Sequence, residues 1–541
     1  MSTAPGRFAN PIGGVHPAVL QRRRRRLLLL GASALIPLIL GLAISVEDSN
    51  PSLLLAVALI GGTVGIVTLV TNRRLEVSVL LLAVYLGLLE GPVKLGSGGH
   101  EAASVVRDVL IFAVALGAFM RLLASRKPIT LPPLSGWVLA FATLVLIEAL
   151  NPNTQSITKA LGGYRQQLEW LPFFFFGYAL MRSKRRFRQF FLILGVIALA
   201  NGVMSTYQTR LSPGQLASWG PGYHELVYGS VVAGTPGGLS GRAFSIEGQA
   251  RIRPPALGTD AGSSGGFGVL AIPALLALLA SVGLRRRWPI VLLLFGALAG
   301  VATGQGRLQV IGAVLAILCF VGLSFSAGKR VTRPLAVILG ITLLALPAGA
   351  VFVSALGSGT FARYSNIAPE NVSSQTSDVN GKTASLEEIP KTVEHAPFGV
   401  GLGSVGAAGG FGGLQTHEGL ESHGVSAETQ YNFVVDELGL PGLLLWCALT
   451  IRLLTLGITG LRRIPDVELR LYLAALIATI LAFTIMGFSG PTMASAAFGP
   501  FFWFSAGTFA YWFITKRRQD ARATGLAPRR GLRAAPLPEP A

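Results

Sequence analysis

Residues 285–333 have the sequence RRRWPIVLLLFGALAGVATGQGRLQVIGAVLAILCFVGLSFSAGKRVTR, and this segment already defines a pair of membrane-spanning helices. Two apolar runs, 288–303 and 307–326, are joined by the short connection Gly304-Gln305-Gly306, and a basic cluster stands at each far end. A helix needs about 20 mostly apolar residues to cross the hydrocarbon core of a bilayer. Lys and Arg gather in the cytoplasmic connections of membrane proteins. The segment therefore predicts two helices that cross in opposite directions, with the short connection outside.

The same pattern recurs from one end of the chain to the other. Apolar runs alternate with connections, and every second connection is rich in Lys and Arg. We predict about 12–14 spans, with fourteen as the best count. The predicted spans are 27–45, 52–70, 75–91, 105–124, 134–151, 166–182, 188–206, 263–283, 288–303, 307–326, 334–356, 437–459, 469–488 and 493–515. The basic alternation places both termini in the cytoplasm.

The composition leads to the same class of protein. Of the 541 residues, 51% are hydrophobic and 13% are charged, with a mean hydropathy of +0.58. Because soluble proteins carry about 25% charged residues, these values exclude a water-soluble enzyme, a disordered chain and a disulfide scaffold. The formal net charge of +20 is spread over short basic clusters between apolar runs. This distribution predicts an all-α, polytopic integral membrane protein with membrane lipids, rather than nucleic acid, as partners.

The predicted organisation has three parts. A basic cytoplasmic N-terminus covers 1–26, a transmembrane domain covers 27–515, and a disordered cytoplasmic tail covers 516–541. Within the transmembrane domain, two outer loops are long, 206–263 and 356–436, and both are rich in Gly. Long loops in compact proteins are usually functional. We therefore expect the chemistry on the outer face of the cytoplasmic membrane.

Two segments flanking the end of the second long loop carry the most specific pattern. They read EHAPFGVGLGS (394–404) and AETQYNFVVDELGLPG (427–442). Together they resemble the large loop of the O-antigen ligase and polysaccharide polymerase superfamily. That family's pattern runs roughly His-Pro-Leu-Phe-Gly-Val-Gly-x-Gly, then His-Asn-x-Tyr-Leu, then Glu-Leu-Gly-x-x-Gly. The similarity covers about 150–490, and it implies a membrane glycosyltransferase with a GT-C-type architecture.

The resemblance also implies which substrate this chain would bind. The expected donor is a glycan on a polyprenyl pyrophosphate, and the expected acceptor is a glycan or glycolipid. Three segments stand where the family has outer arginines, namely Gly241-Arg242-Ala243, Gly304-Gln305-Gly306-Arg307 and Phe361-Ala362-Arg363. Other envelope polysaccharide-assembly proteins are further expected partners. The sequence leaves a ligase and an exopolysaccharide polymerase both open.

Arginine suits a pyrophosphate leaving group. Its guanidinium group binds phosphate oxygens in bidentate fashion and stays charged, so it stabilises the growing negative charge without a metal. We assign donor binding to arginines on the predicted outer side, where positive charge runs against the inside bias. These residues are Arg165, Arg242, Arg307 and Arg363. Arg251 and Arg253 are open to the same role or to a role as solvated loop charges, and we expect no cofactor and no metal site.

The acceptor hydroxyl needs a base when it attacks the anomeric carbon. This chain has Glu428-Thr429 where the family's ligases have His-Asn, and in the ligases that His is the proposed general base. A carboxylate can serve instead, so we predict Glu428 as the catalytic base, followed by Glu437 and His423. The structural alternative is that Glu428 or Glu437 only favours the positive end of a helix. His395 and His417 are expected to be solvated loop residues.

Two other classes of protein remain as alternatives. A polytopic transporter, such as a lipid-linked oligosaccharide flippase, can also have about fourteen spans. Many transporters are built from repeats and carry polar residues along a central path. This chain shows no obvious repeat, and its charges gather in two outer loops rather than at mid-span. A non-catalytic envelope scaffold would not need an outer set of arginines with a carboxylate.

Overall fold

The structure is a computed structural model of the whole chain. It describes residues 67, 74–96, 101–125, 130–154, 156–229, 243–246, 249–260, 262–283, 287–325, 382–405 and 429–523. The chain divides into two compact units, one of residues 1–81 and 104–129, and one of residues 82–103 and 130–541. The first unit contains the start of α3 and most of α5. All contacts described below lie within the second unit.

The described residues are mostly helical, as the composition predicts. The helical elements are α3 (Arg74–Val84), the π-helical turn η1 (Tyr85–Leu89), α4 (Glu90–Gly96), α5 (Glu101–Ala124), α6 (Ser135–Glu148), α7 (Ile157–Leu168), α8 (Pro172–Leu180), α9 (Lys184–Gln208), α10 (Pro213–Ala217), α11 (Pro221–Tyr228), α12 (Ser263–Ser281), α13 (Arg287–Thr303), α14 (Arg307–Phe325), α17 (Lys382–His395), α18 (Gln430–Leu461), α19 (Val467–Met486), the 3₁₀ turn η9 (Thr492–Ala494), α20 (Phe498–Phe509), the π-helical run η10 (Ala510–Lys516) and α21 (Arg517–Ala523). The strands are β1 (Ala243–Ile246) and β2 (Gln249–Ile252).

Several of these helices are long and apolar enough to cross a membrane. Within the described part of the chain there are six, namely Leu75–Gly96, Lys184–Gln208, Ser263–Ser281, Arg307–Phe325, Gln430–Leu461 and Val467–Met486. The helices Ser135–Glu148 and Arg287–Thr303 are apolar but shorter. The chain therefore has the helices of a multi-pass membrane protein. The predicted spans 27–45, 52–70 and 334–356 lie outside the described residues, so the count of fourteen remains a prediction.

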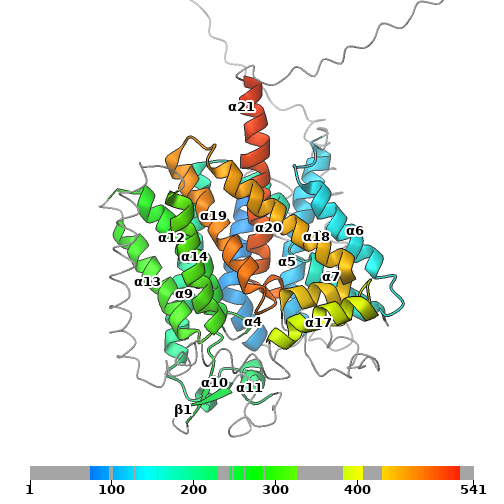
Figure 1. Cartoon of the computed structure of the whole chain (residues 1–541). Helices are drawn as coiled ribbons and strands as arrows, with labels where there is room; N and C mark the ends of the chain where they lie inside the picture. The colour runs from blue at the N-terminus through cyan, green and yellow to red at the C-terminus, as the bar shows by residue number, and fades with distance from the viewer. Residues whose placement is uncertain are drawn as a thin grey trace, which may run out of the picture. The chain divides into compact units, whose positions relative to one another are not determined.

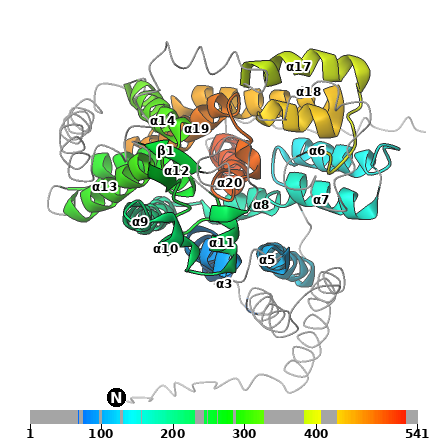
Figure 2. The same ribbon diagram turned by 90° about the horizontal axis from the view of Figure 1, so that it is seen from below.

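Helix α12 is enclosed by its neighbours in the second unit. It packs against α9, α13, α14 and α19 (Figure 2), and 89% of its most apolar window is buried inside the protein. Small residues allow the surrounding backbones to come close. A Cβ atom added to Gly202 of α9 would lie 3.0 Å from the backbone nitrogen of Gly300 in α13. In a bilayer the hydrophobic effect does not drive helices together, because lipid tails are as apolar as the helices. Close packing at small residues drives their association instead.

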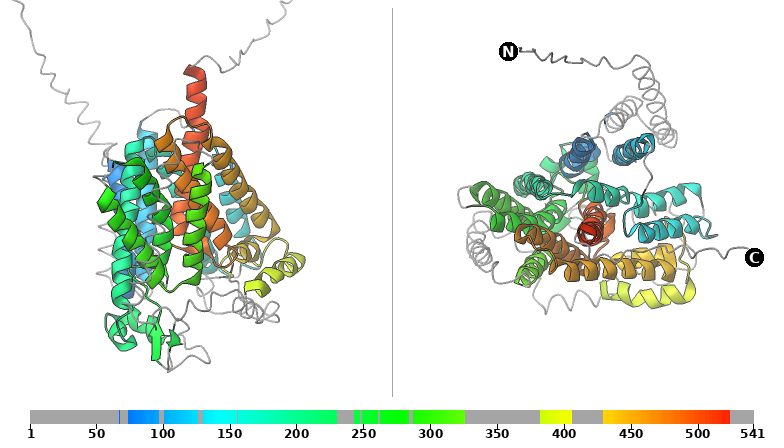
Figure 3. Two further views of the ribbon diagram at one scale, coloured as in Figure 1. Left: turned by 60° about the vertical axis from the view of Figure 1, so that its left-hand side comes forward. Right: turned by 90° about the horizontal axis from the view of Figure 1, so that it is seen from above.

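Three predicted segments differ from the structure at an end. The span 166–182 is two helices, α7 and α8, because Pro172 cannot donate a backbone hydrogen bond and starts a new helix at its first turn. The span predicted to begin at 437 is preceded by a helical segment from Gln430, which Thr429 caps by accepting from the backbone N–H of Asn432 at 3.1 Å, and the backbone breaks at Gly439 close to the predicted start. The tail predicted as disordered from 516 starts as helix, and Figure 3 shows α20 running through η10 into α21.

Ionic and polar contacts join several basic connections at one end of the helices. The Lys184 ammonium group lies 2.8 Å from the Asp466 carboxylate, and their hydrogen bond lowers the pKa of Asp466. The Ser281 and Tyr472 hydroxyls are 2.9 Å apart, and the Trp512 indole N–H donates to the carbonyl oxygen of Met181 at 2.6 Å. The connections after α8, α12, α18 and η10 therefore meet at the same end, as the charge alternation requires. That this end is cytoplasmic remains a prediction.

The other end carries a small ordered cap from the first long loop (Figure 1). The cap consists of α10, α11 and the antiparallel hairpin β1–β2, in which Phe244 pairs with Arg251. This hairpin is an addition to the predicted all-α fold. Buried side chains from the cap and from α4 form one apolar cluster, consisting of Leu95, Leu216, Ala217, Tyr223, Val227 and Ile252. The cap is therefore packed against the transmembrane helices through α4.

We expect opposite labelling of the two ends by a membrane-impermeant thiol reagent. The background chain carries Cys319→Ser and Cys447→Ser, because these are its two cysteines. Ser218→Cys, at an exposed site between α10 and α11, should react in intact cells, or in spheroplasts if there is an outer membrane. Gly283→Cys, where a Cβ atom meets nothing within 4 Å, should react only after permeabilisation. The reverse pattern would invert the topology.

Candidate functional site

The two segments that carry the family resemblance are in direct contact. The backbone N–H of Val400 donates to the carbonyl oxygen of Asp436 at 2.6 Å, and the N–H of Leu440 donates to the carbonyl oxygen of Pro397 at 2.8 Å. Helix α18 is kinked between them, at Gly439, whose φ of +63° is in the left-handed region. A Cβ atom at Gly439 would collide with Pro397, so both the conformation and the contact require glycine there. The pattern is thus one local structure, not two independent motifs.

Glu437 lies at the centre of this contact and is fully buried. One carboxylate oxygen, Oε2, accepts from the Gln167 side-chain amide at 2.6 Å. The other, Oε1, accepts from the Gln166 side-chain amide at 3.3 Å and from the backbone N–H of Gly403 at 3.1 Å. The backbone N–H of Val405 adds a further bond. Each of these partners donates to a carboxyl oxygen of Glu437, so the buried side chain has its hydrogen-bond partners inside the protein.

The glycine-rich loop 399–405 owes its shape to three residues with positive φ. Gly399, Gly401 and Gly403 have φ of +92°, +100° and +72°. The loop packs on α7, where a Cβ atom at Gly163 would lie 2.6 Å from the backbone nitrogen of Gly403. The Asn151 side-chain amide, following α6, donates to the carbonyl oxygen of Gly399 at 3.2 Å. The loop therefore joins α6, α7 and α18, and the N–H of Gly403 donates to the Glu437 carboxylate.

The connection 487–499 contacts two helices at the same end, α18 and α14. The backbone N–H of Gln430, two residues after Glu428, donates to the carbonyl oxygen of Gly487 at 2.9 Å, and its side-chain oxygen accepts from the N–H of Met493 at 2.8 Å. A Cβ atom at Gly490 would lie 3.1 Å from Leu308, the residue after Arg307. The connection thus contacts both the first turn of α18 and the first turn of α14.

The structure describes some of the predicted site residues. Arg307 is the first residue of α14 and is half-buried. Arg165 is half-buried on α7, immediately before the two glutamines that hold Glu437. Arg165 is therefore adjacent in the sequence to the residues that bind Glu437. Outside the described residues lie Arg242, Arg363, Glu428, His417 and His423.

The remaining loop residues fall into two groups. Arg251 and Arg253 are half-buried at the end of the hairpin, and the Arg251 guanidinium group donates to the carbonyl oxygen of Thr209 at 3.2 Å. His395 is exposed at the end of α17, and its Nδ1 atom is 2.8 Å from the carbonyl oxygen of Lys391. Within the described ranges, no group of three or more His, Cys, Asp or Glu side chains is arranged to hold a metal ion.

Sequence reasoning missed three glutamines. Gln166 and Gln167 bind Glu437 from about 270 residues away, and no local pattern links them. Gln305 stands between two glycines in the connection before Arg307, and it is 3% exposed with a φ of +54°. Its burial could not be predicted, because a polar residue in a connection usually lies at the surface.

The comparisons with known proteins add no relative. No protein-family model matches this chain, and no curated protein sequence matches it. The function proposed for the chain therefore depends on its own residues and their arrangement.

We expect Glu437→Gln to destabilise the protein by about 1–3 kcal/mol, because one donor among its buried partners would then face an NH₂ group. Adding Gln167→Glu should recover part of this loss, since it restores one carboxylate to the cluster. Glu394→Gln, an exposed change on α17, is the matched control and should change stability by less than about 0.5 kcal/mol. Denaturation of the detergent-solubilised protein measures all three. A stable Glu437→Gln protein that has lost turnover would instead favour Glu437 as the base.

Proposed function

We propose that this protein is a membrane glycosyltransferase of the O-antigen ligase or polysaccharide polymerase type. It transfers or polymerises glycan from a polyprenyl-pyrophosphate-linked donor onto an acceptor sugar on the outer face of the cytoplasmic membrane. The observation that carries the proposal is the 487–499 connection. It contacts the first turn of α14, which Arg307 begins, and the first turn of α18, which follows Glu428 by two residues.

The roles of the candidate side chains follow from their chemistry. Arg307 and Arg165 are assigned to the pyrophosphate, since a guanidinium group fits phosphate oxygens and neutralises the charge of the leaving group. Arg242 and Arg363 are assigned to the same role from their places in the sequence. Glu428 is assigned as the base that takes the proton of the acceptor hydroxyl. The order of events is donor binding, attack of the acceptor oxygen on the anomeric carbon, and departure of the polyprenyl pyrophosphate.

The contact around Glu437 supports the proposal in a second way. The residues that resemble the family's large loop, Pro397 to Gly403 and Glu437 to Gly442, form one hydrogen-bonded unit. In the sequence, the segment 406–428, which includes Glu428 and His423, lies between the two halves of this unit. A rigid support on each side of a catalytic segment lowers the cost of holding reactive groups in place.

The direct test is transfer by the purified full chain in lipid nanodiscs. The substrate is a polyprenyl-pyrophosphate-linked oligosaccharide prepared with the lipid fraction of the source cells. The proposal predicts that longer or transferred glycan appears together with free polyprenyl pyrophosphate, in equal amounts. Movement of intact lipid-linked glycan between the leaflets, with no release of polyprenyl pyrophosphate, would identify a flippase instead.

A further inference from the structure

Phe398 is an aromatic side chain that points outward from the start of the glycine-rich loop. It is 70% exposed, although Val400 two residues later is buried. The backbone on both sides of Phe398 is fixed, because the carbonyl oxygen of Pro397 accepts from the N–H of Leu440 and the N–H of Val400 donates to Asp436. A single exposed apolar side chain is common on a protein surface, so its surroundings decide what it faces.

The surroundings of Phe398 are the start of an apolar row on α18. Leu440, which is bonded to the residue before Phe398, is followed along the helix by the exposed Leu444, Ile451 and Ile458. At about 3.6 residues per turn, these four side chains lie on one side of the helix. Helix α18 is long and apolar enough to cross a membrane, so an exposed apolar row on it faces lipid. Phe398 continues this row beyond the kink at Gly439.

The length of α18 places Phe398 near an edge of the hydrocarbon core. From Leu440 to Leu461 the helix rises about 33 Å, and the hydrocarbon core of a bilayer is about 30 Å thick. Arg462 and Arg463 are exposed directly after the far end of this helix. Basic side chains at the end of a membrane helix reach into the headgroup layer. Leu440 and Phe398 therefore lie at the opposite surface of the bilayer, at the end that carries the cap.

Exposed aromatic side chains mark the same end of two other helices. Phe488 is 48% exposed after the end of α19, and its ring centroid lies 4.4 Å from that of Tyr431. Tyr207 is 54% exposed, follows the exposed Val203 by one turn of α9, and stacks on Trp219 with 6.1 Å between the ring centroids. Aromatic residues are enriched at both interfaces between a membrane and water. Three separate elements thus indicate one bilayer surface.

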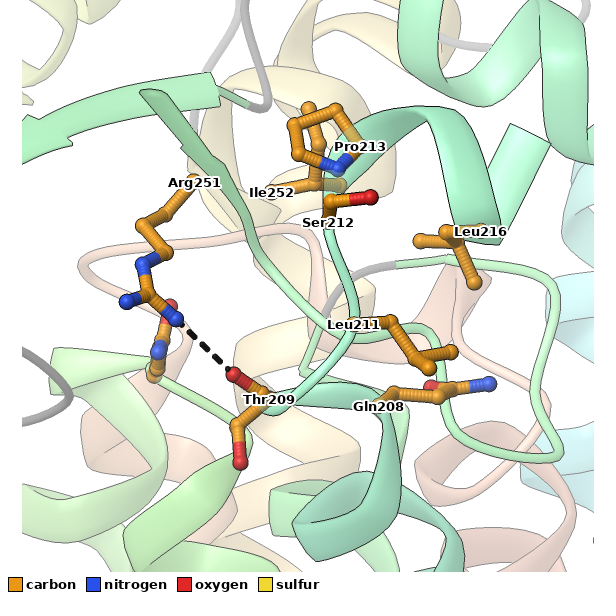
Figure 4. Close-up of a pocket in the computed structure, with 9 residues that line it drawn as sticks. Gln208, Thr209, Leu211, Ser212, Pro213, Leu216, Arg251 and Ile252 are labelled. Atoms are coloured by element: carbon orange, nitrogen blue, oxygen red, sulfur yellow. Dashed lines mark hydrogen bonds between the residues drawn. The ribbon is translucent and has the colours of Figure 1, made fainter. Parts of the chain in front are cut away.

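Polar groups begin directly beyond these aromatic residues. After Tyr207 the chain turns at Thr209 into the cap, and Figure 4 shows the Arg251 guanidinium group donating to the Thr209 carbonyl oxygen, at 3.2 Å. On α17, which packs beside α18 (Figure 2), Lys391 and Glu394 are exposed. The change from exposed aromatic to exposed polar side chains within a few residues is typical of the boundary between acyl chains and water.

We propose that the bilayer surface at the cap end passes through Phe398, whose ring inserts among the acyl chains beside Leu440. Phe398 then anchors the glycine-rich loop 399–405 to the membrane. Lipid is the occupant of this surface, because the apolar row of α18 leads up to it and charged side chains start just beyond it. The anchor holds the loop and the Glu437 carboxylate near the headgroups. A polyprenyl pyrophosphate carries its phosphates at that depth, but the inference goes beyond the proposed function and does not depend on catalysis.

The test is depth-dependent fluorescence quenching of the full chain in lipid nanodiscs. In the background Cys319→Ser and Cys447→Ser, Phe398→Cys is labelled with an environment-sensitive fluorophore. The quenchers are a phospholipid with a nitroxide near the start of its acyl chain and iodide in solution. The label at 398 should emit at a shorter wavelength than in water and should be quenched by the nitroxide lipid, with little effect of iodide.

Two matched sites control the measurement. Glu394→Cys, at an exposed position of α17, should give the reverse result, with quenching by iodide and little by the nitroxide lipid. Leu444→Cys, in the apolar row of α18, should be quenched by the lipid. Quenching of the label at 398 by iodide to the same extent as at 394 would overturn the proposal. So would quenching by neither agent, because a second copy of the chain or its own segment 406–428 would then cover the ring.

A second measurement uses the unaltered protein. A phospholipid with a photoactivatable diazirine near the start of its acyl chain should crosslink to peptides that contain Phe398, and labelling of α18 peptides without any at Phe398 would contradict the anchor. The two proposals also fail separately. Lipid contact at Phe398 without glycan transfer would remove the enzyme and keep the anchor. Glycan transfer without lipid contact at Phe398 would remove only the anchor.

Discussion

Arg307→Ala is expected to lower glycan transfer at least about 10²–10³-fold, while the protein still inserts and accumulates. The physical reason is that a fixed cation at the start of α14 stabilises charge that develops on the leaving pyrophosphate, and loss of one such donor costs about this factor. Arg307→Lys should recover little, because an ammonium group is a point charge and cannot reproduce the bidentate guanidinium. The measurement is release of polyprenyl pyrophosphate by the purified variants.

Arg287→Ala is the control for this change. Arg287 begins α13, at the end of that helix opposite to Thr303, and its guanidinium group donates to the carbonyl oxygen of Val282 at 3.2 Å. It should transfer glycan at close to the wild-type rate. Transfer should also continue in the presence of chelators, since the arginines take the role that a metal would have. Wild-type turnover by Arg307→Ala would remove this residue from the mechanism.

Glu428→Gln is expected to lower turnover about 10²–10⁴-fold and leave donor binding intact, because a general base contributes about this factor. Glu428→His should be partly active, since imidazole can also accept a proton. The structural alternative is that Glu428 only favours the start of α18, which Thr429 caps. That role is worth about 0.3–1 kcal/mol of stability and would not change the pH dependence of turnover.

Two measurements separate these roles of Glu428. Turnover across pH in nanodiscs reports the base, and denaturation in detergent reports the helix start. Glu394→Gln, the exposed change used above, is again the matched control and should change neither. If Glu428→Gln turns over at the wild-type rate, Glu428 is not the base, and Glu437 and His423 become the next residues to change.

The positions of most helices could be predicted from local sequence. In lipid, a segment must satisfy its own backbone hydrogen bonds, so a long apolar run is enough to specify a helix. The predicted spans 188–206, 263–283 and 307–326 match α9, α12 and α14 within a few residues. The basic clusters also predicted which connections lie at the same end of the helices. The contact between Lys184, before α9, and Asp466, before α19, confirms this for these two connections. Predicted ends differ from the structure where Pro172 or Thr429 starts a helix, and at 516, where η10 continues into α21.

The candidate site was predicted less completely. The glycines of 399–403 and the Glu437-Leu438-Gly439 turn were recognised as a pattern, but their contact was not. The sequence suggested a catalytic or a helix-end role for Glu437, whereas the structure surrounds it with donors from α7 and from the glycine-rich loop. The burial of Gln305 was invisible in the sequence for the same reason. Hydrogen bonds between distant segments depend on how the helices pack, and local composition does not predict helix packing.

Hydropathy determined that α12 and α14 are membrane helices, and only the tertiary structure decided which of them lies inside. Their most apolar windows have mean hydropathies of 1.8 and 2.4, yet 89% of the first is buried in the protein and only 28% of the second. The physical reason is that lipid tails are as apolar as leucine, so a helix gains nothing from composition alone when it leaves lipid for the protein core. Its place is set instead by close packing, as where the α12 residue Gly268 meets Val301 of α13.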